Sequence, residues 1–231
     1  MIFADRRDAG IKLGEELFSH LERCKQDRSK SDLLVVGLPR GGVPVALEVA
    51  RRLNCPLDII ASKKLPYPGQ PEYAIGAVSS DGVIVLKPDL PSEHPWPEYL
   101  EEQRQKLLLQ TREIEQRFHS QAGLKSPSYA GKTVIIVDDG IATGMTAIAA
   151  VKTARLRGVS HIILAAPVMS NDSRRKLSTY CDEVIALSLP EDFFAVGRYY
   201  LNFAQTTDEE VVAALTWSAE HIQGTTNQSP N

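Results

Sequence analysis

The sequence predicts an α/β fold in which helices cover both faces of a twisted parallel sheet, with an inserted hairpin and long helix and a small hood. Short apolar runs alternate with helix-forming runs before residue 65 and again after residue 131, which is typical of βαβ units. One apolar run, residues 134–137, leads directly into two acids and a loop of small residues. Strand–turn–helix units this short require parallel pairing through right-handed crossovers.

The size and composition of the chain are those of an ordinary soluble globular protein. Its 231 residues suffice for one large domain with an insertion, and 43% of them are hydrophobic and 24% charged. The net charge of −3 provides no basic field for nucleic acid, and no apolar run approaches the ~20 residues of a membrane span. We therefore expect neither DNA nor a membrane as a partner.

The cysteines and histidines give no sign of a disulfide framework or a metal site. The three cysteines are scattered, and the N-terminus becomes charged at Asp5 with no apolar stretch after it, unlike a signal peptide. We therefore expect the cytoplasm, where thiols stay reduced. No two histidines are close in the sequence, which argues against a His-rich zinc site. Each of the five is expected at the surface: His20, His94, His119, His161 and His221.

The first strand–helix units follow from apolar spacing. Residues 8–23 have apolar positions near helical spacing and should form an amphipathic helix. Residues 33–38 are a short apolar run between a polar stretch and a proline, which predicts a buried strand leading into a helix at 43–53. A second strand is predicted at 57–61 and ends beside two lysines.

The stretch of about 65–130 is predicted to be an insertion. Its prolines make residues 66–71 a flexible loop that cannot be a helix or a central strand. Residues 74–78 and 83–86 predict a hairpin, and about 98–118 a long helix. This helix fits packing or the contact of a homodimer, and a lid over a site is the alternative.

The βαβ alternation resumes after residue 131. The predicted elements are strand 133–137, helix 147–157, strand 162–166, helix 171–179 and strand 183–187. An irregular, aromatic-rich hood should follow at about 189–205, and a helix at 208–221. Residues 1–222 are thus expected to form one domain, and the polar tail 223–231 to be disordered.

The stretch from Val134 to Thr146 carries the clearest chemical signal in the sequence. Four β-branched residues precede Asp138 and Asp139, and small residues then lead into a helix. In open α/β sheets, such a turn offers backbone N–H groups and a helix N-terminus to a phosphate. No lysine follows Gly144, which excludes a Walker-type P-loop. The simpler alternative is that the acids only cap the next helix.

This pattern resembles the fingerprint of type I phosphoribosyltransferases, in which an apolar strand and two acids precede a loop ending in Thr-Gly-x-Thr. The resemblance covers most of residues 1–205 and implies phosphoribosyl pyrophosphate (PRPP) as co-substrate with Mg²⁺ as cofactor. It implies that Asp138 and Asp139 meet the ribose hydroxyls and hold the metal indirectly. The residues implied in binding the 5′-phosphate are Gly140, Ala142, Thr143, Gly144, Met145 and Thr146.

A second glycine loop, Arg40-Gly41-Gly42, also lies between a predicted strand and a predicted helix. In the family that this chain resembles, this position binds pyrophosphate and often contains a non-proline cis peptide. Glycines suit such a loop, because the backbone must turn tightly while the cation faces the pyrophosphate. Taken alone, the loop is explained better by a plain strand-to-helix turn.

Lys63 and Lys64 form the third candidate element, at a predicted strand end on the ligand-binding edge of the sheet. The resemblance implies a mobile loop here that closes over the reacting centre and excludes water. A solvated surface is the alternative for either lysine. We expect Lys63 to bind pyrophosphate, and Arg40 and Lys64 to be catalytic residues together with the acid pair.

The predicted hood contains five aromatic residues between positions 193 and 203. Planar rings can stack on a flat heterocycle, and the resemblance implies a base-binding hood after the last core strand. The base-binding candidates are Phe194, Tyr200 and Phe203, and core packing is the alternative for each of them.

Ala142 narrows the expected acceptor. In 6-oxopurine members of the family, this position holds an aspartate that handles a base proton, so hypoxanthine and guanine are disfavoured. The chain is most similar to a group of uncharacterised bacterial phosphoribosyltransferases that share its Arg-Gly-Gly-Val-Pro loop and its Asp-Asp-Gly-Ile-Ala-Thr-Gly motif. The resemblance does not name the base.

The expected activity is transfer of a 5-phosphoribosyl group from PRPP to a nitrogenous base, with release of pyrophosphate. The sequence identifies no general base, and Glu72 and Tyr73 are no more than candidates for one. The main alternative is a non-catalytic regulator of the same fold that senses PRPP or a nucleotide. A phosphotransfer domain with acids at strand ends fits less well, since the chain has no Asp-x-Asp motif at this position.

Overall fold

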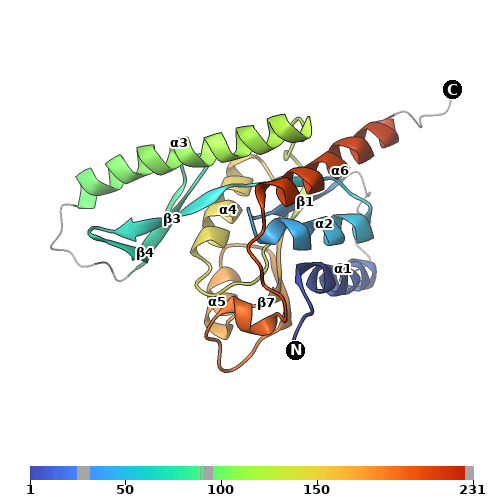
Figure 1. Ribbon diagram of the computed structural model, residues 1–231, viewed down its shortest axis with the longest axis horizontal. Coiled ribbons are helices and arrows are strands. Elements are labelled where there is room, and N and C mark those ends of the chain that lie inside the picture. The colour runs from blue at the N-terminus through green and yellow to red at the C-terminus, as the bar shows by residue number, and fades with distance from the viewer. Residues whose placement is uncertain (25–31, 89, 91–95, 227–231) are drawn as a thin grey trace.

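The computed structural model describes residues 1–24, 32–88, 90 and 96–226. Its main sheet has five strands and lies between layers of helices (Figure 1). The strand order is β2-β1-β6-β7-β8, and every pairing is parallel. The strands are β1 Leu33–Gly37, β2 Leu57–Ile59, β6 Thr133–Val137, β7 His161–Val168 and β8 Glu183–Ser188. The predicted fold class, a parallel sheet with helices on both faces, is confirmed.

One face of the sheet is covered by three helices, α1 Arg6–Arg23, α2 Gly42–Leu53 and α6 Asp208–Thr226. Side chains alternate between the two faces of a strand, so Val35 and Ile135 point to this side. They pack with leucines, valines and alanines of the three helices and with the end of the insertion helix. The resulting cluster is buried and almost entirely aliphatic.

The other face is covered by α4 Met145–Leu156 and α5 Asn171–Leu177. Here the alternate strand residues, such as Val36 and Ile136, pack against the alanine-rich face of α4. Small side chains allow this helix to lie close to the sheet. The two apolar faces explain why the central strands appear as continuous apolar runs in the sequence.

The insertion is an arm made of a second sheet and a long helix. Its antiparallel sheet has the order β3-β4-β5. The elements are β3 Ser62–Tyr67, β4 Gln70–Ser79, β5 Ile84–Leu86 and α3 Trp96–Ala122. In Figure 1 this arm projects from the main sheet. Helix α3 lies above β3 and β4 and extends to α6, which it contacts. The arm has an apolar core of its own, which includes Leu65, Ile75, Val78 and Leu107.

The prediction of a loop at residues 66–71 is wrong. Pro66 lies inside β3, β4 begins at Gln70, and only the turn between these strands is irregular. A proline is accommodated because β3 is an edge strand and its pairing register shifts on both sides of Pro66. Gly69, at φ +74°, supplies the left-handed conformation of the tight turn.

The region after β8 forms the hood and then α6. A short 3₁₀ helix, Val196–Tyr199, lies in the hood, and Tyr200 pairs with Phe3 in an isolated parallel bridge. Helix α6 continues to Thr226, into the segment predicted as a disordered tail, and residues 227–231 lie outside the described residues. Among the helices described, none has the length and apolar content that a membrane span requires.

Candidate active site at the carboxyl edge of the sheet

The two predicted ligand loops meet at the carboxyl edge of the sheet. β1 and β6 are neighbours in register, so the loops that follow them lie side by side. A Cβ atom on Gly41 would lie 2.1 Å from Oδ2 of Asp139, and one on Gly42 would lie 2.7 Å from the carbonyl oxygen of Val137. Only glycine fits at these two positions, because any side chain would displace the acid pair or its strand.

The loop after β1 has the backbone feature that the sequence resemblance implies. The peptide bond between Pro39 and Arg40 is cis, and Arg40 is not a proline. Gly42 then opens α2, and its N–H donates to the carbonyl oxygen of Leu38. The glycine loop is therefore a compact turn that exposes the Arg40 side chain.

The acid pair is largely buried. The N–H of Asp139 donates to Oδ1 of Asp138 at 2.9 Å. Burial raises the pKa of Asp138 well above its usual range, the neighbouring Asp139 raises it further, and the cations Arg6 and Lys64 oppose this. Burial also raises the pKa of Asp139, against the effect of Arg6. The pair is thus a concentrated negative site that a cation would stabilise.

Arg6 is a site residue that the sequence did not indicate. From the first turn of α1, its Nε and a terminal nitrogen lie 2.9 and 2.8 Å from Oδ2 of Asp139. Its other terminal nitrogen donates to the carbonyl oxygen of Ala204, and its guanidinium lies 3.9 Å from the centre of the Phe203 ring. Arg6 and Asp139 are far apart in the chain, and no motif surrounds Arg6, so only the fold reveals the pair.

Two of the three hood candidates support the acid pair instead of lying free. The Tyr200 hydroxyl donates to the carbonyl oxygen of Asp139 at 2.5 Å, and its ring stacks on Phe203 with centroids 4.9 Å apart. Burial raises the pKa of the Tyr200 hydroxyl, so it stays a donor. Phe194 differs from both, because 73% of its surface is exposed.

The predicted phosphate loop leads into the N-terminus of α4. Gly144 has φ +72°, and α4 begins at Met145, so the first-turn amides have no partner within the helix. A cavity of about 440 Å³ lies beside this loop. It is lined by Ala142, Thr143, Ser170, Asp172, Ser173, Lys176, Phe193 and Phe194. The loop and the exposed hood aromatic therefore share one cavity.

Arg40 faces a second cavity, of about 320 Å³, between the glycine loop, α3 and α6. Its guanidinium lies 3.3 Å from Oδ1 of Asp208, the first residue of α6. The other oxygen of Asp208 lies 2.8 Å from Arg117 of α3. The cation expected to face pyrophosphate is therefore paired with a carboxylate that the sequence did not single out.

The two lysines lie inside β3, where successive side chains point to opposite faces. Lys63 Nζ donates to Oε1 of Gln110 on α3 at 2.8 Å and also lines the cavity beside Arg40. The charge of Lys64 opposes the burial that raises the pKa of Asp138, so this lysine acts on the acid pair. The structure thus separates the two lysines into an arm-facing cation and a site-facing cation.

The two general-base candidates lie near the tip of the arm. Glu72 and Tyr73 are exposed residues of β4, close to the turn that joins it to β3. The Tyr73 ring packs on Tyr67, with centroids 5.9 Å apart. Within the part of the chain that the structure describes, no recorded contact joins either residue to the acid pair.

The chain is similar in sequence to a known protein family. Residues 11–204 match the family described as phosphoribosyl transferase domain. In two strains of Mycobacterium tuberculosis, a protein provisionally named a phosphoribosyl transferase is 42% identical over 215 residues. The match covers 93% of this chain and 46% of each of those proteins, so the chain spans about half the length of the curated relatives it matches.

Two solved structures resemble the fold of this chain. TT1426 from Thermus thermophilus is 39% identical, with a TM-score of 0.77 over 95% of this chain and 100% of that one. AQ2163 protein from Aquifex aeolicus is 12% identical, with a TM-score of 0.51 over 83% and 78% of the two chains, and shows the fold alone. The family match spans most of the chain and includes both glycine loops and the acid pair, so the chain belongs to the phosphoribosyl transferase domain family.

Proposed function

We propose that the chain is a Mg²⁺-dependent phosphoribosyltransferase that moves the 5-phosphoribosyl group of PRPP to a nitrogenous base and releases pyrophosphate. The contact between Arg40-Gly41-Gly42 and the acid pair carries this proposal. It places a cationic loop and an acidic loop against each other at the edge where α/β sheets bind ligands. Membership of the phosphoribosyl transferase domain family supports the same reaction class.

The loop from Gly140 to Thr146 is proposed to hold the ribose 5-phosphate. Its backbone N–H groups and the N-terminus of α4 supply an uncharged anion site, and the Thr143 and Thr146 hydroxyls add donors. Asp138 and Asp139 then accept hydrogen bonds from the ribose hydroxyls. Both ends of the sugar are fixed in this arrangement, which lowers the entropic cost of reaching the transition state.

In the proposed reaction, the bond between the anomeric carbon and the pyrophosphate oxygen breaks, and its electron pair leaves with pyrophosphate. The acceptor nitrogen forms the new bond to that carbon and loses its proton. Arg40 and Lys64 stabilise the charge on pyrophosphate, with Lys63 as an additional contact. The acid pair favours the positive charge that develops on the sugar.

The donor set at the acid pair fits Mg²⁺. Two adjacent carboxylates provide oxygen atoms, which this ion prefers, and burial leaves their negative charge poorly solvated. Arg6 already occupies Oδ2 of Asp139, which favours contact with the ion through the substrate or water. When bound, the ion would supply charge neutralisation for pyrophosphate.

The cavity beside the phosphate loop is the proposed acceptor site. Phe194 is exposed beside it, whereas Tyr200 and Phe203 are held by contacts to each other and to the site. Ala142 lines this cavity and carries no acid, which supports an acceptor other than a 6-oxopurine.

We further propose a cytoplasmic homodimer. The three free cysteines support a reducing compartment such as the cytoplasm. The exposed Leu109 on α3 supports a dimer contact, and light scattering tests whether the chain is a dimer.

Calorimetry with PRPP and Mg²⁺, followed by a pyrophosphate-release assay over a panel of bases, tests the proposed activity. We expect binding, release with at least one base, and loss of both in the double variant Asp138→Asn, Asp139→Asn. The matched control is Glu101→Gln with Glu102→Gln, an adjacent acid pair exposed on α3. Absence of binding at millimolar PRPP, or a double variant that behaves like the parent, would contradict the proposal.

A second candidate function is a non-catalytic sensor of PRPP or a nucleotide. The ion pair between Arg40 and Asp208 supports it, because it neutralises the cation that a leaving pyrophosphate needs. Tight binding of PRPP without pyrophosphate release for any base would favour the sensor over the enzyme.

A further inference from the structure

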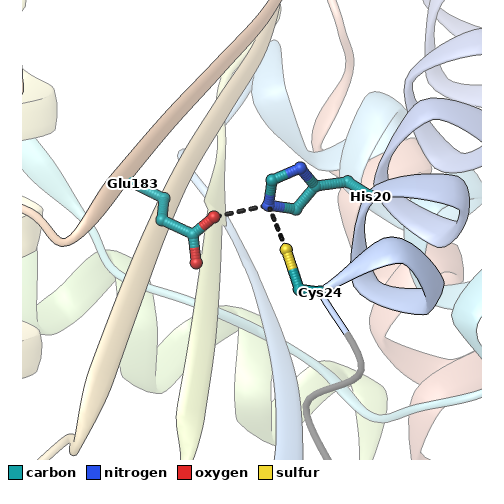
Figure 2. Close-up of side chains that lie close together, drawn as sticks. All are labelled: His20, Cys24 and Glu183. Atoms are coloured by element: carbon teal, nitrogen blue, oxygen red, sulfur yellow. Dashed lines mark hydrogen bonds and ion pairs between the residues drawn. The ribbon is translucent and has the colours of Figure 1, made fainter.

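A second cluster of ionisable side chains lies at the opposite edge of the sheet from the ligand loops. His20 is in the last turn of α1, Cys24 follows that helix directly, and Glu183 is the first residue of β8 (Figure 2). His161, the first residue of β7, lies beside Glu183. Because all strands of the sheet are parallel, strand starts lie at its amino edge, away from the acid pair.

The three side chains in Figure 2 converge on one small volume. Nε2 of His20 contacts Oε2 of Glu183, and Sγ of Cys24 lies 3.6 Å from the same nitrogen. All three potential ligand atoms lie within 4.8 Å of one another. Zinc bonds of about 2.0–2.3 Å in a tetrahedron separate ligand atoms by about 3.3–3.8 Å. The sulfur–nitrogen distance matches this range, whereas the contact between His20 and Glu183 would have to open.

Helix geometry explains how two of the ligands come together. His20 and Cys24 are four residues apart, which places both side chains on the same face of α1. That face meets the start of β8, so Glu183 approaches from a separate element. A set of one imidazole, one thiol and one carboxylate is characteristic of zinc and similar transition metals, whereas Mg²⁺ prefers oxygen alone.

The carboxylate of Glu183 is held in the manner of a supported metal ligand. Its Oε1 receives a hydrogen bond from Nε2 of His161 at 2.8 Å, and Nδ1 of that histidine lies 3.8 Å from Oδ2 of Asp182. These contacts orient the carboxylate, with Oε2 directed at His20.

A plain hydrogen-bonded link between α1 and β8 needs only His20 and Glu183. Cys24 adds only a long sulfur contact to that link, yet its sulfur completes the triangle, and its side chain is exposed rather than packed in the core. The side chains of His20 and Glu183 are 24% and 22% exposed, so an ion can reach them from solvent. These features favour a ligand set over a structural pair.

We propose that His20, Cys24 and Glu183 bind a Zn²⁺-class transition metal, with one coordination position left for water. The ion ties the end of α1 to the amino edge of the sheet. The site is separate from the proposed catalytic edge and does not rest on the proposed function. The sequence argued against a histidine-based zinc site because its histidines are scattered; that expectation missed the His-x₃-Cys spacing and the folding of Glu183 against it.

The test is metal binding by the whole chain after removal of metals with a chelator. Calorimetry with Zn²⁺ should show one equivalent bound, and Co²⁺ should give the absorption band of a thiolate-to-metal transition. Cys24→Ser should abolish the Co²⁺ band and weaken Zn²⁺ binding by more than the about 10–100-fold that loss of a supporting residue costs. Zn²⁺ should also raise the melting temperature of the parent and leave that of Cys24→Ser unchanged.

Two matched variants serve as controls. Cys181→Ser removes a buried thiol outside the cluster, and Glu22→Gln removes an exposed carboxylate of α1. Both should keep the Co²⁺ band and the Zn²⁺ affinity. The proposal is overturned if the parent binds no Zn²⁺, if Co²⁺ binds without a thiolate band, or if Cys24→Ser binds Zn²⁺ as tightly as the parent.

Discussion

At the scale of single residues, the ion pair with Arg6 compensates the buried negative charge of Asp139. The two side chains are only 13% and 14% exposed, and the cation also reaches Ala204 and Phe203. A buried carboxylate that loses its partner is left uncompensated. Arg6 is therefore a positioning residue for Asp139 and not a solvated surface residue.

Replacing Arg6 with alanine should lower the free energy of unfolding by about 3–5 kcal/mol, since it breaks a buried pair. The adjacent Arg7 is the matched control: 74% of its side chain is exposed, and its contact to Glu48 is 3.6 Å long. Arg7→Ala should cost less than about 1 kcal/mol. Urea unfolding of both variants measures the difference, and equal losses would show that the pair is not the stabilising contact.

At the scale of elements, α1 lies against α2 through two glycines. A Cβ on Gly10 would lie 2.8 Å from the carbonyl oxygen of Val45, and one on Gly14 would lie 3.0 Å from Cβ of Arg52. Neither helix has room for a methyl group at Gly10. The close approach sets the position of α1, and with it the position of Arg6.

Gly10→Ala should destabilise the chain by about 1–3 kcal/mol through overpacking, although alanine gains about 1 kcal/mol in helix propensity. Gly14→Ala should cost less, because its nearest neighbour is the side chain of Arg52 and not backbone. Melting temperatures of the two variants test this order. A melting temperature of Gly10→Ala above that of Gly14→Ala would contradict it.

At the start of α6, Asp208 offsets the positive charge of the glycine loop through its ion pair with Arg40. This carboxylate pairs with Arg40 and Arg117 beside the 320 Å³ cavity. Asp208→Asn should tighten binding of pyrophosphate about fivefold, or roughly 1 kcal/mol, because Arg40 is freed and a repelling charge is lost. The neighbouring Glu209→Gln is the control and should leave affinity unchanged. Calorimetry with pyrophosphate decides, and weaker binding by Asp208→Asn would refute the idea.

At the scale of the whole molecule, one buried acid joins the arm to the main body. Oε1 of Glu115 on α3 accepts from the N–H of Ala61 at 2.6 Å and from the Ser80 hydroxyl at 2.5 Å. Its other oxygen lies 3.2 Å from Arg157, which follows α4 and also binds Asp81. The network contacts the ends of β2, β4 and α4 at once, so it fixes the root of the arm.

The pH dependence of stability should report this network. Burial raises the pKa of Glu115 above its ordinary 4.5, against the effect of Arg157. The folded state then binds more protons than the unfolded state above pH 4.5. The contribution of Glu115 is therefore greatest at low pH and falls as the pH rises through the raised pKa. Glu115→Gln should flatten this fall.

Urea unfolding at several pH values above 4.5 measures the slope in the parent and in Glu115→Gln. The control is Glu113→Gln, which alters an exposed glutamate on the same helix. It should retain the slope of the parent. A Glu115→Gln variant whose slope equals that of the parent would show that another group causes the pH dependence.

The sequence could predict the main sheet because its strands are continuous apolar runs that pack on two apolar helix faces. It could not predict β3, since local proline rules oppose a strand there and only pairing with β4 as an edge strand overrides them. The glycine loop and the acid pair were predictable, because their chemistry is local. Arg6 and Asp208 were not, because their partners lie far along the chain.

The order of the strands also has a consequence for folding. β1 and β6 are neighbours, yet roughly 95 residues, including the whole arm, separate them in the chain. Closing such a loop costs only about 0.6 kcal/mol more for each doubling of its length. An insertion of this size between β1 and β6 therefore adds little to the free-energy cost of closing the loop. Because the two ligand loops follow the two strands of this pair, the two halves of the pocket come together only when this long-range contact forms.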